Sequence, residues 1–470
     1  MSEAGYTYSD ISISPYKFEK IINLSISREM NHHASLYLYG TIPEDELDKY
    51  VENASDGESV GIFVNDGGAV VPLFQGAVTK ISVSVVANVR CVAIEALSST
   101  FLMDVKKKDR SFQNKDSLYG DIFKKVTGEY KKGEVVDEAS KGKPTGGLLV
   151  QYHETDWEFI KRLASHFNAP LVPTCTHTGI KYYIGVPDIP EKYNLEDFNY
   201  SVVKDLKGYK IKAENDIKDL DERDLISYEV TTRKILELCS PVKYKDKKLY
   251  VHSVQIEMIN GILSNSYVLR DMKGLDRHKL SNNLLSGTSL FGKIIDVTKD
   301  MVKVHLDIDE TQSVDEAMWF PYSTVYSSPD GSGWYCMPEK DDQVRLYFPD
   351  NDEKNAFCAS AVNLTSSDPE KRSDPAVKSI STKYGKQVIF KPGAIEIIAG
   401  KELLLKLTDD GGMEFTSAKK IIFDAKEDIV IMGDAKVTLD GKEGIELNQS
   451  GTSIKIKDDV TISGGQVKIE

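Results

Sequence analysis

The C-terminal part of the chain repeats a simple pattern of apolar and polar positions. From residue 385 onward, short segments with two apolar residues two positions apart alternate with polar or glycine-containing turns. Between 413 and 445 the first apolar residue of each pair recurs every eight residues. Side chains two positions apart lie on the same face of a strand, and a fixed step indicates stacked structural repeats. The pattern therefore predicts a solenoid of short strands.

Each repeat contributes too little apolar surface to close a core within one chain. The stripe of apolar pairs and the strand edges would stay open to water, which favours aggregation. Three chains wound around a common axis would cover both, because the stripes meet on the axis and each strand pairs with neighbouring chains. We therefore predict an intertwined, triple-stranded β-helix over 386–470, with an ordinary antiparallel sheet of short hairpins as the alternative. The predicted trimer core comprises sixteen residues: Ile395, Ile397, Leu403, Leu405, Met413, Phe415, Ile421, Phe423, Ile429, Ile431, Val437, Leu439, Ile445, Leu447, Ile454 and Ile456.

The preceding part of the chain is organised differently. Residues 364–385 contain Ser-Asp-Pro twice and few apolar residues, so we expect a neck linker there. Residues 287–363 contain short strands and a hairpin turn at Thr298–Asp300, which predicts a small barrel of the OB type. Residues 1–286 mix strands, one of them expected over 81–96, with two helices. The predicted fold class is mainly β with an α+β head.

Two helices of the head have clear sequence signals. The second helix begins after Thr155, which forms the pattern of a capping box with Glu158. We expect this helix to direct Lys161 and Arg162 outward and to end near Asn168. The first helix follows Asn114 and places four apolar residues on one face: Leu118, Ile122, Phe123 and Val126.

Composition and charge exclude several classes of protein. The 470 residues include 59 Lys and Arg against 73 Asp and Glu, a net charge of −14. No basic domain is visible, so we expect no nucleic-acid partner. No apolar run approaches the ~20 residues that span a bilayer. The polar start, Met1–Asp10, lacks the features of a secretory signal peptide, so we expect a protein made in the cytoplasm.

No group of residues points to catalysis or to a metal site. The motifs of serine hydrolases, zinc proteases and phosphate-binding loops do not occur in the sequence. Cys175 and His177 have a metal-like spacing without a second cluster, and the pair His32–His33 is interpreted as surface. We interpret the pair His153–Glu154 as loop residues that lead into the second helix. The sequence therefore predicts no enzyme activity, no cofactor and no metal.

Four segments resemble the spike proteins of contractile injection systems. This family comprises the VgrG-type spikes of type VI secretion systems and the fused hub and needle of contractile phage tails. Asp109–Ser117 resembles the Arg-x-Phe-Gln-Asn-Lys-Ser sequence before the first head helix of that family. Gln151–Leu163 is very close to its Gln-Tyr-x-Glu-Thr-Asp-Trp-x-Phe-x-x-Arg-Leu. Gly333–Phe348 resembles the motif of its barrel, although Asp341 replaces a glycine, and Ser379–Gly385 resembles its entry into the β-helix.

The resemblance implies a mechanical function. Three hub-like heads would form a ring that docks onto an inner tube protein and baseplate proteins. Sheath contraction would then drive the β-helix through a target envelope. The implied partners are two further copies of the chain, a PAAR-type tip protein held by Val467, Ile469 and Glu470, and separate effector cargo. The spike would be assembled in the bacterial cytoplasm and ejected with the particle.

Two other functions stay open at this point. The chain could be a phage-tail enzyme that degrades polysaccharides, or an adhesin, each with a trimeric β-helix. The enzyme would need aromatic and acidic grooves along the β-helix, and the adhesin would need a C-terminal receptor domain. The resemblance fits a type VI system and a phage-tail-like particle equally. The aromatic residues available for such a groove are the four in and just before the repeat: Tyr384, Phe390, Phe415 and Phe423.

Overall fold

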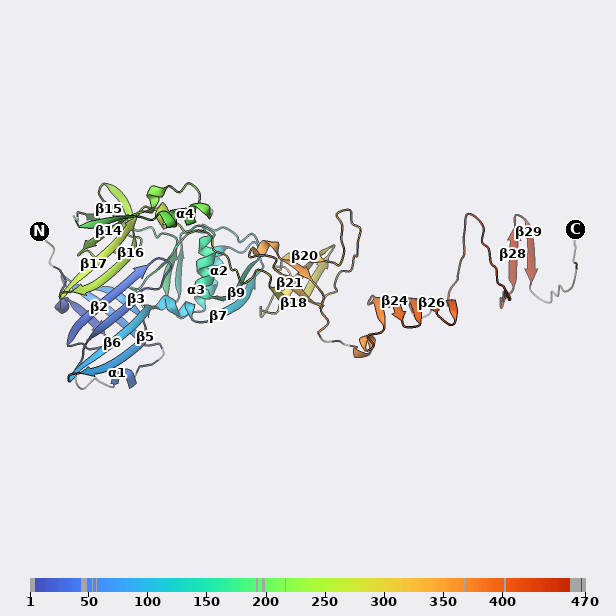
Figure 1. The fold of residues 1–470 in the computed structure, drawn as a ribbon, viewed down its shortest axis with the longest axis horizontal. Coiled ribbons are helices and arrows are strands. Elements are labelled where there is room, and N and C mark those ends of the chain that lie inside the picture. The colour runs from blue at the N-terminus through green and yellow to red at the C-terminus, as the bar shows by residue number, and fades with distance from the viewer. Residues whose placement is uncertain are drawn as a thin grey trace. The chain divides into compact units, whose positions relative to one another are not determined.

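Strands dominate the computed structural model of the chain (Figure 1), which confirms the predicted mainly β fold class. The chain divides into two compact units, Met1–Leu364 and Thr365–Glu470. The structure describes residues 5–43, 49–52, 54–55, 57–191, 193–196, 199–215, 217–364, 366, 368–400, 403–456 and 466.

The head is built on a 12-stranded sheet. Its strands are β1 (Ile11–Ser14), β2 (Lys20–Glu29), β3 (Ser35–Thr41), β4 (Ser59–Asp66), β5 (Ala69–Val86), β6 (Val89–Ser98), β12 (Tyr193–Leu195), β13 (Tyr200–Lys204), β14 (Ile226–Thr232), β15 (Pro241–Tyr244), β16 (Lys247–Ile259) and β17 (Ile262–Arg270). The main path runs β1–β4–β5–β6–β3–β2–β16–β17–β14–β13, and β15 pairs with both β12 and β16.

The strand order of the head joins its first and last strands. The N-terminal strands and the strands after residue 192 belong to one continuous sheet, because β2 pairs directly with β16. In that pairing Glu29 lies opposite Ser253 and Ser25 lies opposite Glu257. A hydrophobic core that draws on both groups of strands covers one face, with Leu24 and Val254 among its buried members.

The segment 81–96, predicted as a single strand, is a hairpin of β5 and β6. Ala87 and Asn88 form its turn with φ angles of 51° and 64°. Two successive residues with positive φ give the turn whose twist matches that of the flanking strands. The alternation of apolar residues continues through this turn, which is why the periodicity alone gave one strand.

Two helices and two small sheets complete the head. The elements are β7 (Lys107–Phe112), α2 (Tyr119–Gly128), β8 (Glu134–Asp137), β9 (Leu149–Thr155), α3 (Asp156–Ser165), β10 (Leu171–Pro173) and β11 (Lys181–Ile184). Strands β10, β11 and β8 form one small sheet and β7 pairs with β9. The predicted capping box of α3 is confirmed, since Thr155 Oγ1 accepts from Glu158 N at 3.1 Å and Glu158 Oε2 accepts from Thr155 N at 2.9 Å. The helix ends at Ser165, before the expected Asn168.

The last part of the first unit is a closed five-stranded barrel. Its strands are β18 (Ser289–Thr298), β19 (Met301–Leu306), β20 (Trp319–Ser323), β21 (Gln343–Tyr347) and β22 (Phe357–Ala359), in the order β18–β19–β20–β22–β21. The small predicted barrel is thus confirmed, with β20 as the strand that the sequence did not indicate. Leu148 and Val150 of the head are buried in the barrel core together with Val302 and Val304. Head and barrel therefore share hydrophobic packing.

The remaining helical elements are short. They are η1 (Tyr8–Asp10), α1 (Lys49–Glu52), η3 (Ser99–Asp104), α4 (Leu206–Glu214), η4 (Glu222–Leu225), η5 (Lys273–Leu275), η6 (Glu353–Asn355) and η7 (Pro369–Arg372). Among the described residues, no helix combines the length and the apolar character that a membrane crossing requires.

The second unit contains a five-stranded antiparallel sheet and a separate hairpin. The sheet comprises β23 (Lys378–Ser381), β24 (Lys386–Lys391), β25 (Ala394–Ala399), β26 (Leu403–Thr408) and β27 (Gly412–Ser417), and the hairpin comprises β28 (Ile445–Gln449) and β29 (Thr452–Ile456). Consecutive strands pair with each other within the chain, which is the alternative that the sequence left open. The arrangement of three chains stays a prediction.

Residues 418–444, all of them described, form no strand, although the repeat predicts three strands there. A strand needs a hydrogen-bonded neighbour, and none of the described residues pairs as a strand with this segment. The predicted trimer would supply that neighbour from an adjacent copy.

Candidate assembly surfaces

One face of the sheet β23–β27 is apolar across all of its strands, and we call it the apolar face. Residues directly opposite each other on paired strands lie on the same side of a sheet. The first row of opposite residues is Ile380, Val388, Ile397, Leu405 and Phe415. The second row is Phe390, Ile395, Leu407 and Met413.

The other face of the same sheet is mixed: it carries Ile389, Ile398 and Leu404 among polar and charged residues. Glu396 lies opposite Lys406, which lies opposite Glu414, so the charges alternate across three strands. Lys391 Nζ also lies 2.8 Å from Glu396 Oε1. Opposite charges in cross-strand positions support this pairing modestly. The sheet is therefore two-faced, with its apolar face as the surface that gains most from a cover.

The predicted trimer-core residues fall into three groups. The sheet places Ile395, Ile397, Leu403, Leu405, Met413 and Phe415 together on the apolar face. The hairpin brings Ile445 opposite Ile456 and Leu447 opposite Ile454. Six further residues lie in the segment without strands: Ile421, Phe423, Ile429, Ile431, Val437 and Leu439. The predicted tip residues Val467, Ile469 and Glu470 lie outside the described residues.

The second candidate region lies inside the first unit, where head and barrel meet. Buried ion pairs and hydrogen bonds connect the two parts there, and we call this region the junction. Arg162, on α3, was expected to point outward but is only 3% exposed. Its Nε and Nη2 donate to Glu154 Oε1 and Oε2 at 2.8 and 2.7 Å. Its Nη1 donates to Glu353 Oε1 of the barrel at 2.9 Å. The outward expectation for Arg162 is therefore wrong.

The two carboxylates account for the burial of Arg162. Desolvation acts to lower the pKa of the guanidinium, but the hydrogen bonds and charges of Glu154 and Glu353 outweigh it and raise that pKa. A buried guanidinium is tolerated when its planar donors meet carboxylates in this way. Helical periodicity could not reveal the arrangement, because Glu353 is 191 positions away in the sequence.

Asp156, the first residue of α3, is a second buried charged centre, which lies within the head beside the junction. Its side chain is fully buried and accepts hydrogen bonds from Lys108 Nζ at 2.6 Å, Arg110 Nη2 at 2.5 Å, Tyr130 OH at 2.6 Å and Gln151 Nε2 at 3.0 Å. Desolvation acts to raise the pKa of this carboxyl, but the hydrogen bonds and the Arg110 charge lower it below its ordinary value. The negative charge of Asp156 thus fixes β7 and β9 against α3.

Strand β7 and the residue after it connect the head to the barrel by hydrogen bonds. Ser111 donates from its backbone N to Asp309 Oδ1 at 2.6 Å and from Oγ to Asp309 Oδ2 at 2.5 Å. Gln113 Nε2 donates to the carbonyl of Val304 at 3.0 Å, and its Oε1 accepts from Met318 N at 3.2 Å. The sequence segments 109–117 and 151–163 therefore supply most of the junction.

The histidines singled out in the sequence have structural partners. The prediction of His153 and Glu154 as loop residues is wrong, because both lie on β9. His153 has a φ of 50° and its Nδ1 is 3.0 Å from Asp109 Oδ1, while Glu154 pairs with Arg162. His33, expected at the surface, is mostly buried, with its ring nitrogens 2.8 Å from Thr100 Oγ1 and 3.2 Å from Asp104 Oδ2.

The candidate metal pair does not form a ligand cluster. Cys175 is buried, with Sγ 3.7 Å from the carbonyl oxygen of Leu73, whereas His177 is exposed. Among the described residues, no group of three or more His, Cys, Asp and Glu side chains could hold a metal ion.

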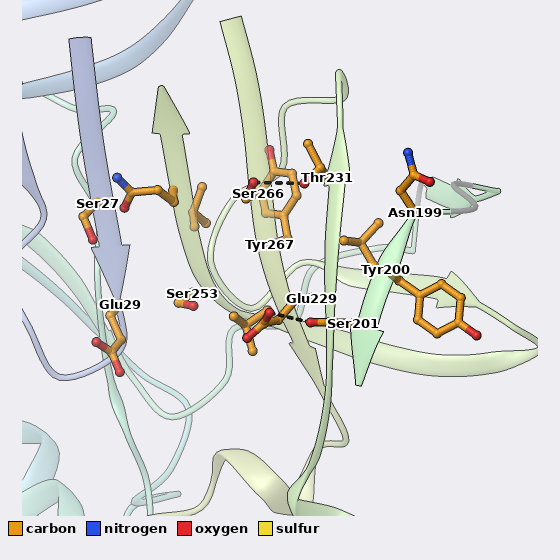
Figure 2. A pocket seen from close by; sticks show the side chains of 14 residues that line it. Ser27, Glu29, Asn199, Tyr200, Ser201, Glu229, Thr231, Ser253, Ser266 and Tyr267 are labelled. Carbon is orange, nitrogen blue, oxygen red and sulfur yellow. Dashed lines mark hydrogen bonds between the residues drawn. The ribbon is translucent and has the colours of Figure 1, made fainter. Parts of the chain in front are cut away.

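A polar hollow of about 470 Å³ crosses the outer face of the head sheet over β2, β16, β17, β14 and β13 (Figure 2). Figure 2 shows Glu29 on one side and Glu229 toward the other, where Ser201 Oγ donates to Glu229 Oε2 at 2.5 Å. Thr231 and Ser266 share a second hydroxyl hydrogen bond of 3.1 Å. The lining given for this hollow includes neither histidine nor cysteine, and the Tyr267 hydroxyl donates to the carbonyl of Lys234 at 2.8 Å.

Two family models match segments of the first unit. Residues 292–362, which hold most of the barrel, match the family described as the type VI secretion system/phage-baseplate injector OB domain. Residues 23–189 match the family described as the Alg8 N-terminal domain. None of the curated proteins matches the chain in sequence.

Solved structures decide the fold. An E. coli component of the type VI secretion system, described as structurally similar to the tail proteins gp27 and gp5 of bacteriophage T4, aligns with a TM-score of 0.55 and 11% identity over 75% of this chain and 99% of its own. The chain has the fold of VgrG-type spike proteins. A chain of the Francisella PdpA–VgrG complex aligns with a TM-score of 0.56 and 10% identity over 86% of this chain and 87% of its own. The predicted resemblance to VgrG-type spikes is thus confirmed for the fold, together with the OB barrel.

Proposed function

We propose that this chain is the spike and hub of a contractile injection system, either a type VI system or a phage-tail-like particle. Three copies form the spike, their heads cap the inner tube and dock to the baseplate, and their C-terminal repeats together puncture the target envelope. The VgrG-type fold and the match of the barrel to an injector OB domain support this assignment.

The exposed apolar residues of the second unit, on the apolar face, in the segment 418–444 and in the hairpin β28–β29, carry the proposal. Thirteen of the sixteen predicted core residues are 39–71% exposed in the single chain. Covering a half-exposed large apolar side chain gains about 1 kcal/mol, so the set gains on the order of 10 kcal/mol per chain. Association of two molecules costs roughly 4–15 kcal/mol. A trimer collects the gain from three chains, which is enough to offset two association steps.

The junction suits a protein that transmits a mechanical load. Force applied to the heads has to reach the repeat through the barrel. Arg162 joins α3 to Glu353 of the barrel, and Leu148 and Val150 of the head fill part of the barrel core. Buried, fully paired charges and a shared core oppose hinge motion between head and barrel. The first unit is therefore expected to move as one body when the particle contracts.

The finer parts of the proposal concern partners. Val467, Ile469 and Glu470 of three chains would present a small platform to a PAAR-type tip protein. Effector cargo would travel as a separate protein on the spike, and assembly would take place in the bacterial cytoplasm. Deletion of residues 460–470 is expected to abolish binding of a candidate tip protein while leaving the trimer intact. Unchanged binding would contradict the tip assignment alone.

The solution mass of the purified chain tests the trimer. Light scattering is expected to give a mass of about three chains, and removal of residues 386–470 is expected to reduce it to one. A full-length monomer with a protease-resistant C-terminal part would contradict the spike. The polysaccharide-degrading enzyme and the adhesin would then become the leading candidates.

A further inference from the structure

Between β20 and β21 the chain forms a hairpin at residues 324–336, which we call the aromatic hairpin. Trp334 N donates to the carbonyl of Tyr326 at 2.8 Å, and Ser328 N donates to the carbonyl of Ser332 at 2.9 Å. These two bonds hold the arms of the hairpin together in the antiparallel manner. Tyr326 and Trp334 therefore lie opposite each other, one on each arm.

Close contacts hold the aromatic hairpin together and tie it to the barrel. The arms lie so near each other that a Cβ atom at Gly333 would come within 2.4 Å of the carbonyl oxygen of Tyr326. At the base, the hydroxyl of Tyr335 donates to the carbonyl of Lys299, in the turn between β18 and β19, at 2.8 Å. The barrel therefore anchors the hairpin at its base.

The large apolar side chains of the aromatic hairpin face solvent in the single chain. Val325, Tyr326, Trp334 and Tyr335 are 54–87% exposed, and together they expose roughly 500 Å². An apolar patch of several hundred Å² on a single chain is typical of a surface that contacts another protein. The aromatic hairpin is therefore a candidate interaction surface.

The size of this surface limits the kind of partner that fits it. A stable interface between two separate proteins buries about 800 Å² on each side, so the aromatic hairpin alone is too small to hold a free partner. It fits a partner that other contacts already hold close by, because the second contact then forms at a high effective concentration. The other copies of the chain in the proposed trimer are such partners, because residues 365–377 join each barrel to the first strand of the repeat.

The barrel carries no other apolar surface of this size among residues 287–363, all of which the structure describes. The remaining large apolar side chain exposed there is Val314, in the loop before β20. The matching surface on the barrel of a second copy is therefore the same hairpin. On the basis of the trimeric spike, we propose that the aromatic hairpins of the three copies pack against one another. Such a cluster would join the barrels directly, in addition to the contacts that the repeats make.

Chemical cross-linking of the native full-length protein tests this arrangement. Cys336 lies in the aromatic hairpin and is exposed, whereas the other four cysteines are buried. If the three hairpins meet, a short bis-maleimide is expected to join the Cys336 thiols of two copies. A reagent with two ends can link only two of the three thiols, so at most about two-thirds of the chains should appear as covalent dimers. Light scattering of the same sample gives the mass before cross-linking.

The two measurements separate the hairpin cluster from the spike itself. A mass of about three chains together with covalent dimers supports the hairpin cluster. The same mass without covalent dimers would overturn the cluster and leave the spike standing. A mass of one chain would contradict the spike and the cluster together.

Two variants show where the reagent acts. Cys336→Ser is expected to abolish the covalent dimer. Adding Asp315→Cys to that variant moves the accessible thiol to the exposed loop before β20, at the opposite end of this strand from the hairpin, and should not restore the dimer. Covalent dimers as abundant from this double variant as from the native protein would overturn the cluster, because the reagent would then join thiols regardless of their position.

Discussion

The two units of this chain use their apolar residues in opposite ways. In the first unit, strands, helices and barrel bury their large apolar side chains in three cores within the chain. In the second unit, the same residue types form regular rows but stay half-exposed. The alternation of apolar and polar positions is equally clear in both. The difference shows that such a pattern specifies which face is buried. It does not specify whether residues of the same chain or of a second copy pack against that face.

The sharpest way to break this comparison is a charge on the apolar face. Phe415→Asp is expected to abolish the trimer, because a carboxylate from each of three chains would enter the core at a cost of several kcal/mol apiece. Thr416→Asp, one residue along and on the opposite face, should leave the trimer intact. Light scattering of both variants decides, and a stable Phe415→Asp trimer would mean that the apolar face is not the interface.

The next largest effect is expected on the stability of the first unit, whose apolar faces are buried by residues of the same chain. Arg162→Ala leaves Glu154 and Glu353 buried without a cation and is expected to cost about 3–5 kcal/mol of unfolding free energy. Lys161→Ala, at the neighbouring position, should change it by less than about 0.5 kcal/mol. Denaturant unfolding of residues 1–364 measures both. Equal effects of the two substitutions would show that the junction contributes no stability.

A pH-dependent effect is expected from His166, which packs beside the junction. Burial, assisted by the charges of Arg162, Lys279 and Lys354 and opposed by that of Asp352, lowers the pKa of His166 to about 4. The unfolded chain therefore takes up a proton first as the pH falls below about 6.5. Stability of the first unit is expected to decline between those two pH values, by at most about 3 kcal/mol from this residue, and then to level off.

The variant His166→Asn isolates that contribution. It is expected to flatten part of the decline in thermal stability between pH 6.5 and 4, because asparagine does not titrate. His177→Asn, an exposed position, serves as the control and should leave the profile unchanged. A profile of His166→Asn that superimposes on the native one would assign the decline to other groups.

The smallest expected effect sharpens the account of α3. Thr155→Ala removes the side-chain acceptor of the Glu158 backbone N–H and is expected to cost about 1 kcal/mol. Thr155→Ser keeps the hydroxyl and should recover most of that loss. A shift in the midpoint of thermal unfolding measures the pair, and indistinguishable alanine and serine variants would show that the cap contributes little.

The comparison also explains what the sequence could and could not predict. Local signals were sufficient for the capping box at Thr155, for the barrel strands β18, β19 and β21, and for the buried residues Ile122, Phe123 and Val126 of α2. The predicted face of α2 also included Leu118, which is wrong, because Leu118 precedes the helix and is 37% exposed. The hairpin turn at Ala87–Asn88 was missed because apolar alternation runs through it. The burial of Arg162 was missed because its partner Glu353 is distant in sequence. Strand β20 contains Pro321, which weakens any strand signal.

The candidate surfaces divide in the same manner. The apolar rows around Ile397 and Phe415 were predictable, because register in a short meander follows from the repeat itself. The junction was not, because its hydrogen bonds join residues such as Ser111 and Asp309, which are 198 positions apart in the sequence.

The packing of Leu148 and Val150 inside the barrel bears on how such chains can be recombined. A crossover between two related genes at the boundary near residue 286 would combine a β9 from one parent with barrel strands from the other, and the two halves of that core would no longer match. A crossover near residue 364 separates the two compact units and leaves every core whole. We therefore expect natural and engineered chimaeras to exchange the C-terminal repeat freely, while head and barrel are inherited together.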